Sequence, residues 1–571
     1  MRTNTSHSAM DRRSFLVSAG LATGIASTTG YSALALQEGE PDVPPGISPE
    51  IIAEAEEILG ISFTDNEREQ MRESLEGNKQ IFEMLRGTEF ENALAPAETF
   101  DPRLPGKDYD LDRASSHAAP WRPVESLPNN SLDIAYARVA DLAHWIRTRQ
   151  MSSVELTRIY LDRLHAINEK LECVVTFTDD LAMRQARRAD ELLSRDEYRG
   201  PLHGLPWGAK DLLDTLDIKT TWGAMPFKDR VGSIDAAVVE RLSDAGAVLI
   251  AKTTLGALAY GDIWFDGRTN NPWNLEQGSS GSSAGSASAT AAGGMAFSIG
   301  TETYGSIMSP SSRCGTTGFR PTFGRVSRHG AMALCWSLDK IGPICRTANC
   351  CELVLDAING YDARDDGSIH APLHFERTRP LGELAVGFDP SHYEGERVSD
   401  GDRAVLQICR DAGCAMKEIE IPSGAFGGII FLSIIVEGAA AFDRLTREDQ
   451  DDLMQWQSNQ AWPNSFRAGR FIPAIEYMQA RRLRRRYMQQ MDELFSGVDL
   501  IIEPQSSGSL HALTNMTGQP ALTFRTGFRD NGTPRANTIW GNLFQDEQVL
   551  ASGGQIERKL DIWHRHPPLD A

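Results

Sequence analysis

Short apolar runs alternate with amphipathic helical stretches along most of this chain, and this alternation strongly constrains the fold. The helical stretches begin at about Asp133, and Ser152-x-x-Glu155 supplies a capping box ahead of one apolar helix face. Four apolar runs of strand length interrupt the helices, at 174–177, 247–250, 384–388 and 498–502. Continuous apolar runs between helices are typical of a sheet buried on both faces. The sequence therefore predicts an α/β fold.

Changes in composition and sequence pattern along the chain predict three segments. Residues 1–35 contain Asp11-Arg12-Arg13-Ser14-Phe15-Leu16, a modestly apolar stretch, and Ala33-Leu34-Ala35, an order that resembles a twin-arginine export signal cleaved near Ala35. Residues 36–130 predict a helical N-terminal extension and linker, with helix starts at Ser48-Pro49 and Thr64-x-x-Glu67 and an extended wrap from about Ala93. Residues 131–571 form the predicted main domain. We expect a periplasmic protein; an uncleaved anchor is the second interpretation and a basic tail the third.

Composition excludes several classes of function. The chain has 571 residues and a net charge of −21, which opposes binding to nucleic-acid phosphates. Its eight cysteines contain no C-x-x-C pair, so we expect neither a zinc site nor a disulfide scaffold. The basic run at 481–486 follows the apolar face of a late helix and predicts a solvated helix surface. His564 and His566 are expected to be surface residues rather than metal ligands.

The segment Gly278–Ser306 is the least ordinary part of the chain, because more than half of its residues are Gly or Ser. A flexible linker is one interpretation, but an Ala-rich helix former and an apolar run follow at once. Gly281-Ser282-Ser283-Ala284-Gly285 also matches G-x-S-x-G, which would make Ser283 the nucleophile of an α/β-hydrolase. That motif needs a strand directly before it, and the preceding polar, Pro-containing stretch 271–277 is a poor central strand.

The segments NPWNLEQGSSGSSAGSASATAAG and GTETYGSIMSPSSRCGTTGFRPTFGRVS resemble the signature of the amidase signature family. The similarity extends to Gly204-Leu205-Pro206-Trp207-Gly208-Ala209-Lys210-Asp211 and, more weakly, to 517–522. It implies a large mixed β-sheet covered by helices on both faces, and it makes 131–571 an amidase catalytic domain.

This resemblance also implies the roles of individual residues. Lys210 corresponds to the general base, Ser282 to the relay serine after a cis Gly281–Ser282 peptide bond, and Ser306 to the nucleophile. The backbone N–H groups of Thr303, Tyr304, Gly305 and Ser306 would form the oxyanion hole. Ser283 and Asp211 would support the site, although Asp211 could equally cap a turn.

The chemistry suits these residue types. A buried lysine whose pKa is lowered by desolvation can accept a proton through Ser282 while Ser306 attacks a carbonyl carbon. The resemblance therefore predicts an amidase that hydrolyses carbon–nitrogen bonds of small amides and requires no metal or organic cofactor. An esterase or carbamate hydrolase with the same triad, or a catalytically silent ligand-binding protein on this fold, is the alternative.

Two residues depart from the family pattern, which has Gly at position 304 and Arg at position 308. Here Tyr304 and Met308 flank the nucleophile. We expect the Tyr304 ring to point toward the acyl channel and the loss of the guanidinium at position 308 to remove a fixed charge nearby, so that the site favours neutral, apolar or aromatic amides over glutamine. The alternative is that Tyr304 points into the core and fills space there. The expected partner is a small-molecule amide, with no nucleic acid and no stable membrane insertion after signal cleavage. The identity of the acyl and amine groups and the choice between a monomer and a homodimer are left open by the sequence.

Overall fold

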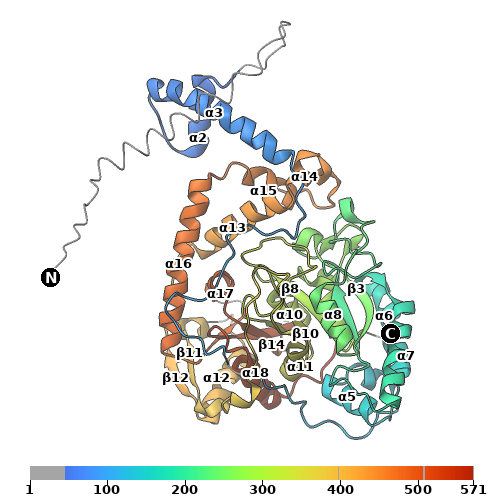
Figure 1. Cartoon of the computed structure of the whole chain (residues 1–571). Helices are drawn as coiled ribbons and strands as arrows, with labels where there is room; N and C mark the ends of the chain where they lie inside the picture. The colour runs from blue at the N-terminus through green and yellow to red at the C-terminus, as the bar shows by residue number, and fades with distance from the viewer. Residues whose placement is uncertain (1–45, 113, 396–397, 506–507, 570–571) are drawn as a thin grey trace, which may run out of the picture. The chain divides into compact units, whose positions relative to one another are not determined.

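The computed structural model describes residues 46–112, 114–395, 398–505 and 508–569 (Figure 1). The predicted export signal, 1–35, lies outside these residues. The chain divides into two compact units, one ending at Glu89 and the other comprising Phe90–Ala571. Residues 90–130, which we predicted to belong to the N-terminal extension, therefore fall in the second unit.

The described part of the first unit contains two helices, α2 (Pro49–Leu59) and α3 (Asp65–Arg86). The Ser48 hydroxyl accepts a hydrogen bond from the backbone at the start of α2, and Gly60 ends this helix in the left-handed conformation. Thr64 and Glu67 form a reciprocal capping box at the start of α3. Both helix starts are where the sequence predicts them.

An eleven-stranded mixed sheet forms the centre of the second unit, and helices cover both of its faces (Figure 1). The strand order is β1-β3-β2-β8-β10-β9-β14-β15-β13-β11-β12. The four predicted apolar runs fall on β1, β3, β11 and β13. The strands of the large sheet are β1 (Val174–Phe177), β2 (Pro206–Lys210), β3 (Val248–Thr253), β8 (Phe297–Glu302), β9 (Thr317–Arg320), β10 (Lys340–Cys345), β11 (Ala385–Phe388), β12 (Ala415–Glu418), β13 (Leu500–Pro504), β14 (Ala521–Phe528) and β15 (Pro534–Gly541).

Strand direction places the carboxyl ends of β2, β3 and β8 at one edge, because β2 pairs in parallel with both of its neighbours. The central strands from β8 to β13 pair antiparallel, and β13, β11 and β12 are parallel again. Two small antiparallel pairs lie outside the large sheet: β4 (Ile263–Trp264) with β5 (Gly267–Arg268), and β6 (Asn270–Asn271) with β7 (Asn274–Gly278). The polar stretch before Ser282 is thus a small hairpin and not a central strand.

The helices of the second unit pack around this sheet. Those of the first half are α4 (Ser131–Ala135), α5 (Val139–Arg147), α6 (Ser153–Leu171), α7 (Asp179–Ser194), α8 (Ala237–Asp244), α9 (Ala284–Ala291), α10 (Met308–Cys314) and α11 (Ala348–Ile358). Those of the second half are α12 (Asp400–Ala412), α13 (Phe426–Ala441), α14 (Asp443–Arg447), α15 (Trp462–Gly469), α16 (Ala474–Ser496), α17 (Leu510–Thr517) and α18 (Asp546–Leu560). Short 3-10 turns are η1 (Met225–Phe227), η2 (Ala257–Ala259), η3 (Phe375–Arg377), η4 (Leu381–Glu383), η5 (Pro390–Tyr393) and η6 (Gln450–Leu453).

The segment from Phe90 to Asn130 runs as an extended wrap along the second unit, as predicted from its composition. The backbone N–H of Ser116 donates to Leu373 O at 2.8 Å, and that of Trp121 donates to the Asn349 side chain at 2.9 Å. These bonds satisfy backbone groups that a strand or helix would otherwise pair.

The predicted solvated face of α16 is wrong at Arg484. This side chain is only 3% exposed, and it donates to Ser337 Oγ at 3.0 Å and to Ser337 O at 2.8 Å. Its guanidinium also lies 3.5 Å from the centre of the Phe100 ring. Arg484 therefore belongs to the face of α16 that packs on the rest of the unit, while Arg482, Arg485 and Arg486 are exposed.

Two further findings concern the described residues only. No helix among them combines the length and the apolar character needed to cross a bilayer. Within the same ranges, no cluster of His, Cys, Asp and Glu side chains could hold a metal ion, and all eight cysteines are free thiols.

Candidate active site

Lys210 is the last residue of β2, and its ammonium group lies at the carboxyl end of the parallel strands. Its Nζ atom is 2.8 Å from Thr301 Oγ1 and 3.4 Å from Thr301 O, near the end of the neighbouring strand β8. The side chain has no exposed surface. Burial lowers the pKa of Lys210 from 10.5 to about 7, against the opposing effect of the Asp339 and Glu302 charges. A neutral amine is therefore accessible near neutral pH.

Ser282 lies directly beside this lysine. The Lys210 Nζ atom is 2.8 Å from Ser282 Oγ, and the Gly281–Ser282 peptide bond is cis, as the family resemblance implies. Glycine is required at 281, because a Cβ atom there would lie 1.8 Å from the carbonyl oxygen of Gly261. The turn after β7 thus brings Ser282 to the end of β2, although the two residues are far apart in the sequence.

The Ser283 side chain forms hydrogen bonds that hold the turn around Ser282 against strand β8. Its hydroxyl donates to Thr301 O at 3.1 Å and accepts from the Thr301 N–H at 3.1 Å. Its backbone N–H donates to Ser306 O at 3.1 Å, and the side chain is fully buried. This arrangement suits a supporting residue and disfavours the exposed nucleophile that the G-x-S-x-G interpretation needs.

Ser306 lies in the loop that joins β8 to α10. Gly305 before it has φ +89°, and a Cβ atom there would lie 2.7 Å from His511 Nε2. Within the described part of the chain, the backbone N–H groups of Thr303 to Ser306 donate to no protein acceptor. Unpaired N–H groups beside a serine are what an oxyanion hole requires.

Glu302, which the sequence analysis did not identify, fixes this loop through hydrogen bonds to the backbone. Its Oε2 atom accepts from the backbone N–H groups of Ile307 at 2.9 Å and Met308 at 3.0 Å. Its Oε1 atom pairs with Arg320 at 2.9 Å and accepts from Asn515 at 2.9 Å. Although burial alone would raise it, these positive charges and donors hold the pKa of Glu302 well below its ordinary 4.5.

Asp211 binds Thr221 and Lys252 rather than Lys210. Its carboxylate accepts from the Thr221 N–H at 2.9 Å and from the Thr221 hydroxyl, and lies 3.5 Å from Lys252 Nζ. Both charged side chains are fully buried. Burial raises the pKa of Asp211 and lowers that of Lys252. Asp211 therefore stabilises the turn after Lys210 through Thr221.

The two departures from the family pattern, Tyr304 and Met308, have different surroundings. Met308 has no exposed surface, and its sulfur accepts from Thr523 Oγ1 at 3.0 Å inside the core, so an uncharged side chain occupies this position. The Tyr304 ring is half-buried against His511, at 5.3 Å between ring centres, and Phe431, at 5.7 Å. Neither residue lines the pocket described next.

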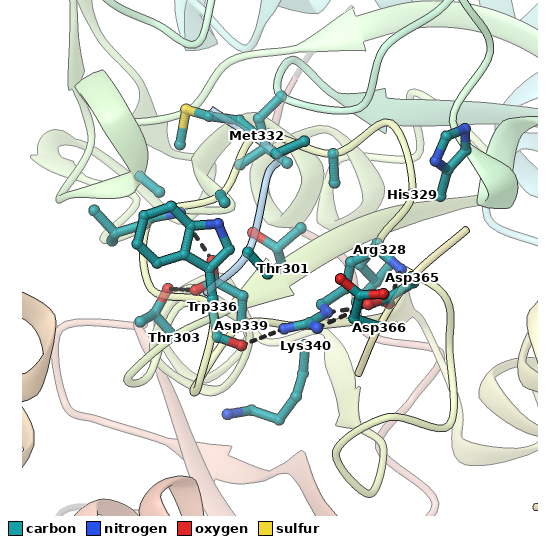
Figure 2. A pocket seen from close by; sticks show the side chains of 18 of the residues that line it. Thr301, Thr303, Arg328, His329, Met332, Trp336, Asp339, Lys340, Asp365 and Asp366 are labelled. Atoms are coloured by element: carbon teal, nitrogen blue, oxygen red, sulfur yellow. Dashed lines mark hydrogen bonds and ion pairs between the residues drawn. The ribbon is translucent and has the colours of Figure 1, made fainter. Parts of the chain in front are cut away.

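A pocket opens beside Thr301 and Thr303 (Figure 2). Asp339 lies on its wall, accepts from the Thr303 hydroxyl at 2.6 Å, and also accepts from the backbone N–H groups of Leu334 and Cys335. Desolvation raises the pKa of Asp339. Since Asp339 also acts on Lys210 through its charge, it links the pocket to the lysine. No local sequence pattern marked Asp339 or Thr301 for this role.

The fold and this arrangement of side chains define a mixed α/β protein with a buried lysine beside a Gly/Ser-rich loop. The family model described as "Amidase" matches residues 155–550, so the chain belongs to the amidase signature family. A glutamyl-tRNA(Gln) amidotransferase subunit from Coxiella burnetii is 31% identical over 481 aligned residues, covering 75% of this chain and 98% of that protein. The corresponding subunit from Pseudomonas aeruginosa is also 31% identical with the same coverage.

Solved structures agree with this assignment. The native peptide amidase from Stenotrophomonas maltophilia is 26% identical with a TM-score of 0.68, and the similarity covers 76% of this chain and 99% of that one. A bacterial aryl acylamidase described as an amidase signature enzyme has a TM-score of 0.67 at 22% identity, with coverage of 76% and 99%, which supports the fold.

Proposed function

We propose that this protein is an amidase that cleaves the carbon–nitrogen bond of small amides through an acyl-enzyme on Ser306. The observation that supports it most is the 2.8 Å contact between Lys210 Nζ and Ser282 Oγ in a fully buried setting. A neutral amine in that position can serve as a general base near pH 7. The similarity to a peptide amidase supports carbon–nitrogen cleavage.

The hydrogen-bond partners of Lys210 suit a base role. A neutral amine has two N–H donors and one lone pair, and the two donors match the hydroxyl and carbonyl oxygens of Thr301. The lone pair is then free to accept the Ser282 proton. As Ser306 Oγ attacks the carbonyl carbon, Ser306 passes its proton to Ser282 and Ser282 passes its own to Lys210. The reverse transfer protonates the leaving nitrogen, and water then cleaves the acyl-enzyme.

The loop Thr303–Ser306 would stabilise the negative oxygen of the tetrahedral intermediate. Its backbone N–H groups are preorganised, because Glu302 and Gly305 fix the loop before substrate binds. Preorganised donors lower the barrier without reorganisation during the reaction, and removing one such donor typically costs about 10²–10³ in rate.

Covalent labelling of the purified protein with a fluorophosphonate, followed by intact mass measurement, tests the assignment. We expect one adduct on wild type, none on Ser306→Ala, and an adduct on Ser283→Ala, which serves as the matched control. Labelling of Ser306→Ala together with loss in Ser283→Ala would instead support the G-x-S-x-G interpretation. A protein that binds amides but is not labelled would instead be the catalytically silent ligand-binding protein.

The type of bond cleaved needs a separate comparison, because the same triad can act on esters and carbamates. Rates for an amide, an ester and a carbamate that share one acyl group would rank these activities directly. We propose a small-molecule amide as substrate, whereas a role like that of the amidotransferase subunits would require partner subunits. Purification with and without co-expressed partners, followed by molar-mass measurement, separates a monomer or homodimer from such a complex.

We also propose that residues 1–35 direct export by the twin-arginine route to the periplasm. The support is the Arg12-Arg13 pair followed by an apolar stretch and Ala33-Leu34-Ala35. Replacing both arginines with lysine should leave the protein in the cytoplasmic fraction, whereas replacing Arg2 with lysine should not. Equal distribution of the double variant and wild type between fractions would reject this route.

A further inference from the structure

The pocket lined by Thr301, the hydrogen-bond partner of Lys210, has one wall that comes from outside the family match, and Lys210, Ser282 and Ser306 do not themselves line it. Ala93 and Ala95 line it, although the matched region begins at residue 155. This segment is a turn with the Leu94 N–H donating to Glu91 O at 3.0 Å, and Leu94 between the two alanines is 58% exposed. The pale blue ribbon of this segment crosses the view of the pocket in Figure 2.

Asn92 fixes this segment to the opposite wall. Its carboxamide accepts from the Ala333 N–H at 2.7 Å and donates to Ala333 O at 2.9 Å, as a paired strand would. The carbonyl oxygen of Asn92 also accepts from the Trp336 indole N–H at 3.2 Å. Ala333 and Trp336 both line the pocket, so the same residue positions the segment and one aromatic wall.

The remaining walls are mainly apolar, and two of the three Lys and Arg side chains among them form ion pairs. Leu212, Met332, Trp336 and Ile341 supply apolar surface. Arg328 pairs with Asp365 at 2.8 Å, and Arg364 pairs with Glu240 at 2.6 Å and with Asp362 at 3.0 Å. Lys340 is buried, and its Nζ atom donates to Leu338 O.

The acidic side chains of the pocket are less completely balanced. Asp366 lies on the pocket wall and is exposed, and Asp339 is partly open to the pocket beside Thr303. A carboxylate entering this space would meet acidic groups, whereas Arg328 and Arg364 are ion-paired and burial lowers the pKa of Lys340 well below its ordinary value. An apolar neutral group would replace water against apolar walls at little electrostatic cost.

We propose that the segment Phe90–Ala95, held by Asn92, is a wall of the substrate pocket that determines specificity. This pocket binds the apolar, uncharged or cationic group of an amide and excludes carboxylates. This inference rests on the proposed amidase function and names the substrate class for that site. Alanine at 93 and 95 leaves the space open, whereas a large residue would fill it.

Filling the pocket tests the wall directly. Acetamide, benzamide and 3-phenylpropanamide form an acyl series of increasing size, and acetanilide probes the leaving-group side. In Ala93→Trp and Ala95→Trp, KM for the larger amides in at least one series should rise by about tenfold or more, while KM for acetamide changes by less than about threefold. Ala97→Trp is the matched control, because residue 97 is exposed and does not line the pocket. Unchanged size dependence in both filled variants would overturn the proposal.

Releasing the segment gives a second test that does not add bulk. Asn92→Ala removes the side chain bonded to Ala333 and should weaken the preference for 3-phenylpropanamide over acetamide by about fivefold or more, whereas Asn129→Ala, an exposed position, should not. Circular dichroism checks that each variant is folded. If all three segment variants unfold, replacing Met332 with Trp fills the same pocket from the opposite wall and decides the point.

Charge selectivity completes the test. Wild type should hydrolyse 4-(aminomethyl)benzamide at least about tenfold faster, in kcat/KM, than 4-carboxybenzamide, and Asp366→Asn should narrow this ratio. An equal or reversed ratio in wild type contradicts the charge argument. Fluorophosphonate labelling of Ser306 separates this inference from the proposed function: absence of both labelling and turnover rejects the function, and titration calorimetry with 3-phenylpropanamide then tests the pocket alone.

Discussion

The Glu302 carboxylate and the Arg320 guanidinium form an ion pair at 2.9 Å, and neither side chain has any exposed surface. The same carboxylate accepts the backbone N–H groups of Ile307 and Met308 directly after the candidate nucleophile. Arg320 also donates to Thr514 Oγ1 and Gln519 O, which come from α17 and the turn after it. The pair therefore joins the loop of Ser306 to α17 and the turn after it.

Breaking this pair should destabilise the protein strongly. Arg320→Met leaves a buried carboxylate without its counter-charge, and we expect the free energy of unfolding to fall by about 3–5 kcal/mol in urea titrations. Arg444→Met removes the partner of Glu448 in a largely exposed pair and should change it by less than about 1 kcal/mol. Similar losses in the two variants would contradict the role of Glu302 as an anchor.

The pH dependence of this stabilisation follows from the lowered pKa of Glu302. A carboxyl whose folded pKa is depressed contributes stability above its unfolded value, here 4.5, and loses it as the pH falls below that value. We therefore expect the difference in unfolding free energy between wild type and Glu302→Gln to be largest near pH 7 and to shrink on acidification below 4.5. A difference that grows on acidification would reverse the sign and reject the assignment.

Local sequence signals predicted most of the fold. The capping boxes at Thr64 and Ser152 start helices as expected, and the apolar run 174–177 is strand β1. Motif matching also identified Lys210 and Ser282, which the structure brings to 2.8 Å. These features depend on residues close in sequence or on a family pattern.

Long-range pairing of polar residues could not be predicted in the same way. Lys252 lies within the strand β3 and Arg484 within a basic run, and both are buried because distant partners satisfy them. The contact of Asn92 with Ala333 joins residues 241 positions apart. Such contacts leave no periodicity in the sequence, because the partners are far apart along the chain.

Lys210 should control the pH dependence of catalysis. Only its neutral form can accept a proton, and burial sets its pKa to about 7, so kcat/KM should rise through one ionisation near pH 7 and level off above it. Lys210→Ala should lower kcat/KM by about 10²–10⁴, whereas Lys219→Ala, in an exposed ion pair, should not. Steady-state rates on the best amide between pH 5 and pH 10 measure this. An acidic limb that persists in Lys210→Ala would assign the base to another residue.

Asp339 should raise the pKa of Lys210 and so shift the pH dependence of catalysis. Its negative charge raises the pKa of Lys210, so Asp339→Asn should move the midpoint of the kcat/KM profile to lower pH. The amide keeps one acceptor oxygen, so it can serve either the Thr303 hydroxyl or the N–H groups of Leu334 and Cys335 but not both, and circular dichroism must first show that the variant is folded. Asp366→Asn is the matched control, because this exposed residue is not among the charges that act on Lys210. A shift to higher pH, or none, in a folded Asp339→Asn protein would exclude the coupling.

Arg484 should contribute far more to stability than the arginines beside it. Its guanidinium donates to both Ser337 Oγ and Ser337 O, two positions before Asp339, and lies against the Phe100 ring. Arg484→Met keeps part of the apolar stem but leaves these buried acceptors unpaired, so we expect the free energy of unfolding to fall by about 2–4 kcal/mol. Arg482→Met, on the exposed face of the same helix, should change it by less than about 0.5 kcal/mol. Equal unfolding free energies of the two variants in urea titrations would contradict a larger contribution of Arg484 and would support the solvated position that its sequence neighbours suggest.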